Sequence, residues 1–120
     1  MPRDRITTSD PILDIRAALA RLDGDDGLLV DLIGFFLEDS GRLLEELKQA
    51  AAAGDANQVK MASHALKGLV ASCGGVRAAE AAQRIEHAGT ANDLTHIDAM
   101  IQALESELES ARNEARGYIS

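Results

Sequence analysis

The stretch VKMASHALKGLVASCGG, residues 59–75, has apolar residues at intervals of three and four, which is the spacing of an amphipathic helix. With about 100° between successive residues, these side chains fall within roughly 60° of the point opposite His64. They are Val59, Ala62, Leu66, Leu69, Val70 and Cys73. The pattern predicts a helix that buries this face and directs His64 towards solvent.

Similar patterns on both sides of this stretch predict four more helices and no strand. The predicted spans are 11–22, 25 or 26–53, 55–73, 76–88 and 92–116. We expect Asp10 and Asp55 to cap two helix starts, and Gly54, the Gly74–Gly75 pair and Gly89 to end three helices. Short connections between these helices favour an all-α fold, an up-down antiparallel four-helix bundle with an additional short N-terminal helix lying across one end.

The composition fits one small domain with an aliphatic core. The chain has 120 residues, of which 46% are hydrophobic, but its aromatic residues are limited to Phe35, Phe36 and Tyr118. Both prolines precede residue 12, so no proline interrupts a helix from residue 12 onward. We expect residues 1–10 to be a flexible segment and residues 11–117 to form the bundle.

The charge pattern narrows the classes of partner. The formal net charge is −8 and the twelve basic residues are dispersed, which argues against nucleic acid and against anionic membranes. No apolar run approaches the roughly 20 residues that a membrane span needs, and the N-terminus lacks the apolar segment of a signal peptide, so we expect a cytoplasmic protein. Cys73 is the single cysteine, which excludes an internal disulfide, and its place on the apolar face predicts a reduced core residue.

The exposed face of the helix predicted over residues 55–73, the central helix of the five, carries residues suited to binding a negatively charged group. Lys60 and Lys67 flank His64 on one side, and Met61 and Gly68 lie on the other. A neutral imidazole is a good nucleophile near pH 7, and the two ammonium groups would stabilise negative charge developing on a transferred phosphoryl group. We expect Lys60 to support this chemistry.

Gly68 is the sharpest signal on this face, because a glycine inside a helix costs about 1 kcal/mol relative to alanine. One turn beyond His64, it would let another backbone or active site approach the imidazole closely. The sequence has no G-x-x-x-x-G-K-[ST] loop and no obvious acidic cluster for magnesium on this face. The phosphoryl group and the metal would therefore come from a partner.

The segment His64-Ala65-Leu66-Lys67-Gly68, with Gly74 ten residues after the histidine, resembles the H-x-L-K-G signature of histidine-containing phosphotransfer (HPt) domains. The resemblance covers about residues 12–110 and includes RIEHAG at 84–89. It implies a four-helix bundle whose exposed histidine relays phosphoryl groups between aspartates of receiver domains. The sequence departs from the family at Leu69 and Val70, where small residues are common, which puts the local packing in question.

The resemblance also implies roles for individual residues. His64 would carry the phosphoryl group on Nε2, Lys67 would position and neutralise it, and Gly68 would let the receiver dock. Glu86 would lie close to the histidine from the adjacent helix. Met61 and Ala71 are candidate docking residues on the exposed face of the same helix.

The resulting hypothesis is a phosphorelay intermediate without its own ATP-binding or kinase site. It would accept the phosphoryl group from a receiver-domain phospho-aspartate, or from a histidine kinase system, and pass it to another response regulator. The implied partners are receiver domains and a hybrid histidine kinase. We expect no cofactor of its own, with Mg²⁺ supplied by the receiver, and a monomer.

Two other functions stay open from the sequence. A helical bundle can house a di-metal site built on Glu-x-x-His motifs, but the nearest match is Asp93-x-x-His96, where Asp93 fits a helix cap better. We expect His87 and His96 to be ordinary surface residues and no metal site. The second alternative is a non-catalytic adaptor that binds receiver or kinase domains without being phosphorylated, although an intact His64 with Lys67 argues against it.

Overall fold

The computed structural model describes residues 12–119, and this part of the chain is helical with no strand. The helices are α2 (Ile15–Arg21), α3 (Asp26–Ala52), α4 (Ala56–Ala71), α5 (Val76–Thr90) and α6 (Ile97–Ile119). For these residues the prediction of an all-helical fold is confirmed. The predicted N-terminal segment 1–10, including the Asp10 cap, lies outside the described residues.

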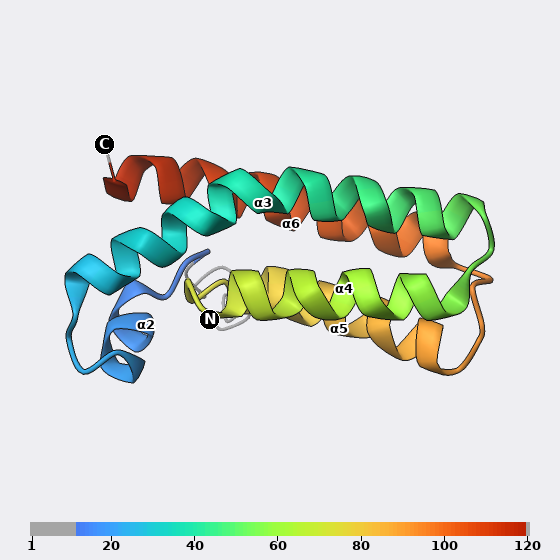
Figure 1. Cartoon of the computed structure of the whole chain (residues 1–120), viewed down its shortest axis with the longest axis horizontal. Helices are drawn as coiled ribbons and strands as arrows, with labels where there is room; N and C mark the ends of the chain where they lie inside the picture. Colours follow the sequence, from blue (N-terminus) through green and yellow to red (C-terminus); the bar gives the residue numbers. More distant parts are fainter. Residues whose placement is uncertain (1–11, 120) are drawn as a thin grey trace, which may run out of the picture.

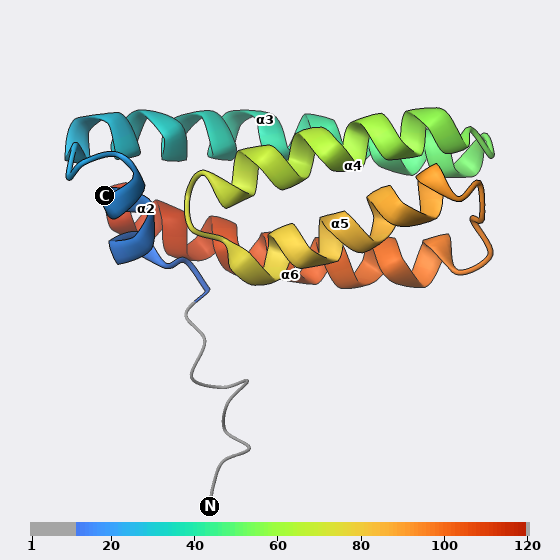
Figure 2. The same ribbon diagram turned by 90° about the horizontal axis from the view of Figure 1, so that it is seen from below.

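The four longer helices lie side by side and reverse direction from one to the next (Figures 1 and 2). Helices α3 and α6 are longer than α4 and α5 and extend past the turn that joins that pair. Helix α2 lies beside this projecting end (Figure 1). The Tyr118 hydroxyl donates to Asp26 Oδ1 over 2.5 Å, which joins the last turn of α6 to the first turn of α3.

Three helices begin at an aspartate that caps the first turn. Asp14, Asp25 and Asp55 each accept a hydrogen bond, at 3.0 to 3.1 Å, from the backbone N–H three residues later. The Asp55 cap is as predicted, whereas the first described helix starts at Ile15, behind Asp14, instead of at Pro11. Helix α6 starts at Ile97, five residues later than predicted, because Asp93 accepts hydrogen bonds from the Thr95 backbone and hydroxyl within a turn.

Gly89 lies inside α5 and does not end it, so its predicted role as a helix stop is wrong. The helix continues to Thr90, and Asn92 takes the left-handed conformation, with φ +55°. Gly89 is buried, and a Cβ there would lie 2.8 Å from the Ala56 carbonyl oxygen and 2.9 Å from the Lys60 nitrogen. The missing side chain lets α5 approach the first turns of α4 closely.

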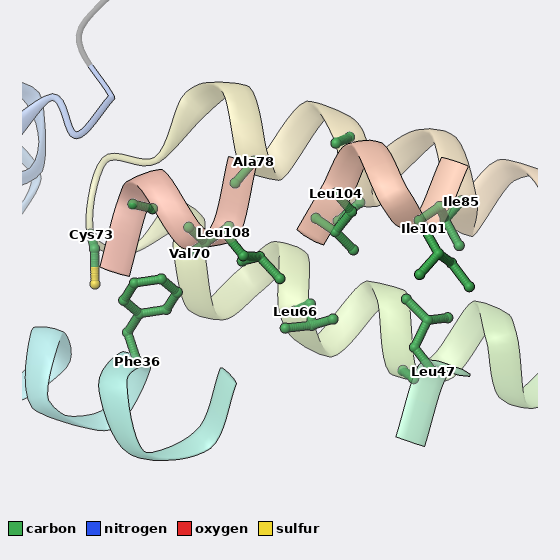
Figure 3. Close-up of a cluster of buried hydrophobic side chains, with 14 of the residues drawn as sticks. Phe36, Leu47, Leu66, Val70, Cys73, Ala78, Ile85, Ile101, Leu104 and Leu108 are labelled. Carbon is green, nitrogen blue, oxygen red and sulfur yellow. The ribbon is translucent and has the colours of Figure 1, made fainter. Parts of the chain in front are cut away.

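Aliphatic side chains from every described helix share one core. Phe36 and Leu47 of α3 point towards α4 and α6 (Figure 3). In α4 the predicted apolar face is buried except at Leu69, which is half-buried. Ser63 is also buried, because its hydroxyl donates to the carbonyl of Val59 over 2.7 Å and leaves no polar group unpaired.

The turn between α4 and α5 supports a prediction on stability. Gly74 has φ +85°, its carbonyl accepts from the Asp14 N–H over 2.8 Å, and a Cβ would overlap the Asp14 backbone. We expect Gly74→Ala to lower the free energy of unfolding by about 2–4 kcal/mol, from the positive φ and the forced separation of backbones. Urea denaturation measures this loss of unfolding free energy. Gly24→Ala is the control, since Gly24 has φ +79° with open space around it; equal losses in both variants would contradict the contact with Asp14.

Candidate functional site

His64 projects from the exposed face of α4, as predicted, and its side chain is 67% exposed. Nδ1 lies 2.9 Å from Oε2 of Glu86, which projects from α5. An ionised carboxylate only accepts hydrogen bonds, so Nδ1 carries the proton and donates it to Glu86. In the neutral form of the ring, Nε2 then keeps its lone pair and is the nucleophilic atom.

Glu86 also binds Lys67, whose Nζ lies 2.7 Å from Oε1. The close Lys67 ammonium, together with the hydrogen bond from His64, lowers the pKa of the Glu86 carboxyl, although burial opposes the shift. The carboxylate is therefore ionised at neutral pH. Its side chain is 16% exposed and that of Lys67 is 28% exposed, so this pair is better shielded from water than most surface ion pairs. We call these three residues the His64–Glu86–Lys67 cluster.

The cluster forms because α4 and α5 pack closely in antiparallel orientation. The two helices are joined by the short turn at residues 72–75, and α5 buries mainly small residues against its neighbours. These are Ala78, Ala81, Ala82 and Gly89, together with Ile85. Glu86 precedes Gly89 by one turn, so the close approach at Gly89 brings the Glu86 carboxylate within reach of the imidazole.

The other predicted site residues surround the cluster on the surface. Gly68 is exposed, and a Cβ there would meet nothing within 4 Å. Lys60 is exposed and forms no ion pair with any residue between 12 and 119, and Met61 is 56% exposed. Ala71 is half-buried, and its carbonyl accepts a hydrogen bond from Arg21 over 3.0 Å. Their positions match the predicted face, while their functional roles stay predictions.

A groove next to Gly68 was not predicted from the sequence. It has a volume of about 380 Å³ and runs between α2, the end of α4 and the start of α5. Gly68, Ala71, Ala17, Val76 and Ala79 give it an apolar lining, and Arg21 and Glu80 are among its polar residues. No local sequence signal could have indicated it, because it depends on where α2 packs.

Other chemistry-bearing residues lie apart from this cluster. His87 and His96 are exposed, and the Asp93 carboxylate is engaged by Thr95. Within residues 12–119 no three or more His, Cys, Asp or Glu side chains come together as a metal site would require. Across the same residues, no helix combines the length and the apolar character needed to cross a bilayer.

The comparisons with known proteins identify the family. A family model described as "Hpt domain" matches residues 31–114. The chain belongs to the HPt family. A solved structure of histidine-containing phosphotransfer protein B (HptB) from Pseudomonas aeruginosa PAO1 is similar over 92% of this chain and 96% of that chain. The two share 26% sequence identity with a TM-score of 0.83. A search of curated proteins finds no match.

The structure explains why this HPt domain can carry Leu69 and Val70 where small residues are common in the family. Val70 is fully buried and Leu69 half-buried, so both belong to the core side of α4 and neither lies beside His64. A Cβ at Gly75 would lie 2.5 Å from Val70 Cγ2, so Gly75 makes the space that the larger side chain needs. These two larger side chains therefore serve the packing of α4 and lie away from the face that carries His64.

The Glu86 ion pair gives this HPt domain a testable pH dependence. A folded-state pKa below the unfolded value contributes stability above the unfolded pKa, and this stability is lost as pH falls through the folded pKa. We expect Glu86→Gln to lower the free energy of unfolding by about 1 kcal/mol at pH 7, since Lys67 loses its charged partner. Urea denaturation at pH 7 and at pH 3 measures this. The deficit should shrink at pH 3, and one that is equal at both pH values would contradict the ionised pair.

Proposed function

We propose that this HPt chain is a phosphorelay intermediate. His64 accepts a phosphoryl group from the phospho-aspartate of a receiver domain, or from a histidine kinase system, and passes it to another response regulator. The observation that carries the proposal is the His64–Glu86–Lys67 cluster: an exposed imidazole whose Nδ1 is fixed by a carboxylate, so that Nε2 is free to react.

The transfer step follows from this geometry. The Nε2 lone pair of His64 forms the N–P bond as the P–O bond to the aspartate breaks, and the electron pair of that bond leaves with the aspartate carboxylate. The ring becomes positively charged and keeps its proton on Nδ1, facing the negative charge of Glu86 over 2.9 Å. The reverse step returns the phosphoryl group to the aspartate of the next receiver.

The receiver supplies what the HPt chain lacks. In the proposal Mg²⁺ is bound by the receiver's active site, which docks over Gly68, with Met61 and Ala71 at the contact. A monomeric up-and-down four-helix bundle in the cytoplasm, with α2 as the extra short helix, holds the site rigidly. Receiver domains and a hybrid histidine kinase are the proposed partners.

Transfer from phosphorylated receivers tests the proposal. Purified receiver domains phosphorylated by acetyl phosphate are mixed with the unchanged chain, and intact-mass spectrometry follows the phosphoryl group. We expect an acid-labile, alkali-stable phosphoryl group on this chain, as a phosphohistidine requires. If receivers bind but none transfers, the chain is instead an adaptor that engages receivers without being phosphorylated.

A further inference from the structure

Lys67 is already engaged by Glu86 and adds little free positive charge beside His64. Its Nζ lies 2.7 Å from Glu86 Oε1, and the side chain is 28% exposed. The ionised carboxylate and the ammonium cancel each other's charge. Before the N–P bond forms, a neutral imidazole with this ion pair carries no net charge, whereas the approaching phosphoryl group brings between one and two negative charges at neutral pH.

Lys60 is the second cation on the same face of α4. It lies four residues before His64, and residues at this spacing on a helix have Cβ atoms about 5–6 Å apart. Its side chain has no ion-pair partner in the described part of the chain, and the residue is exposed. A flexible four-carbon stem gives its ammonium the freedom to follow a group on the imidazole.

Helix α5 fixes the backbone at Lys60. The missing side chain of Gly89 lets α5 come close to the Lys60 N–H and Cβ, one turn from the residue that holds Nδ1 of His64. The base of the Lys60 side chain is therefore held by helix packing while its ammonium is in solvent. The close contact at Gly89 thus brings Glu86 to the histidine and holds the backbone of Lys60, whose place beside His64 is set by the spacing within α4.

We propose that Lys60 is the cation that contacts the phosphoryl group carried on His64, and that Lys67 is a positioning residue that holds Glu86 against Nδ1. This division of roles rests on the proposed function. It differs from the expectation that Lys67 itself neutralises the phosphoryl group, because the structure commits Lys67 to Glu86.

Charge-removal variants test the division. The rate of transfer from one phosphorylated receiver is measured for Lys60→Gln, Lys60→Arg and the control Lys48→Gln, which removes the same charge from the Lys48–Glu105 pair between α3 and α6. We expect Lys60→Gln to be slower by about tenfold, a size consistent with loss of one close charge contact. Lys60→Arg should retain most of the rate and Lys48→Gln all of it. The effect of Lys60→Gln should shrink at high salt.

The ring nitrogens of His64 separate the two lysine roles. By ¹⁵N NMR, Lys60→Gln should keep the proton on Nδ1, whereas Lys67→Gln should weaken that preference because Glu86 loses the ammonium that holds it. Equal transfer rates in Lys60→Gln and Lys48→Gln would overturn the assignment, as would a change of tautomer in Lys60→Gln. If the unchanged chain accepts no phosphoryl group from any receiver, the proposed function fails and the assignment falls with it, a result distinct from a defect confined to the variants.

Discussion

The His64→Gln variant is expected to accept no phosphoryl group from any receiver that phosphorylates the unchanged chain. Glutamine keeps a polar side chain whose amide can donate to Glu86, but it has no nitrogen lone pair that can attack phosphorus. The side chain at this position is 67% exposed, so the exchange leaves the core unchanged. Intact-mass spectrometry after mixing with the phosphorylated receiver gives the result directly.

His87→Gln is the matched control for this loss. His87 is also an exposed histidine, and it lies on α5 without a carboxylate partner within residues 12–119. We expect it to accept the phosphoryl group at the unchanged rate. Phosphorylation that persists in His64→Gln and disappears in His87→Gln would place the reactive histidine on α5 and would refute the role of the His64–Glu86–Lys67 cluster.

Gly68→Glu is expected to reduce phosphoryl transfer by more than about a hundredfold while the domain stays folded. A Cβ at this position meets nothing within 4 Å, so the folded chain has room for the larger side chain. In the docked complex the same carboxylate would occupy the approach to His64 and repel an incoming phosphoryl group, a steric and electrostatic cost of about 3 kcal/mol or more. Transfer kinetics measure the loss, and circular dichroism checks the fold.

Two further variants separate docking from helix stability. Gly117→Glu places the same side chain in α6, where a Cβ also has open space, and should transfer at the unchanged rate. Gly68→Ala should raise the free energy of unfolding by about 1 kcal/mol, because alanine favours the helix. A Gly68→Glu variant that transfers normally would show that partners do not approach His64 over this residue.

The central helix could be predicted well because its own sequence decides which side it buries. The periodicity from Val59 to Cys73 placed His64 in solvent, and the structure agrees. Ser63 was the exception in that stretch. Its hydroxyl donates to the carbonyls of Val59 and Lys60 in the same helix, so this polar side chain can be buried without leaving an unpaired hydrogen-bonding group.

Contacts between helices could not be predicted from the sequence. From the sequence alone, a glycine at position 89 is equally compatible with a helix end and with a close approach of two helices. Only the position of α4 against α5 distinguishes these two roles. The choice between Lys67 and Lys60 as the partner of Glu86 likewise depends on the register of α5 against α4. The HPt resemblance placed Glu86 near His64, but it gave no indication that Glu86 would also bind Lys67.

The helical setting of His64 has a consequence for the timing of partner exchange. Its ring is held from one side by Glu86, and both residues stand on helices packed through small side chains, so no loop has to close before a receiver can react. Association should therefore proceed in a single kinetic phase without a slow rearrangement. For the relay that we propose, we therefore expect the dissociation rate of each spent receiver to limit throughput wherever phosphoryl transfer is faster than dissociation.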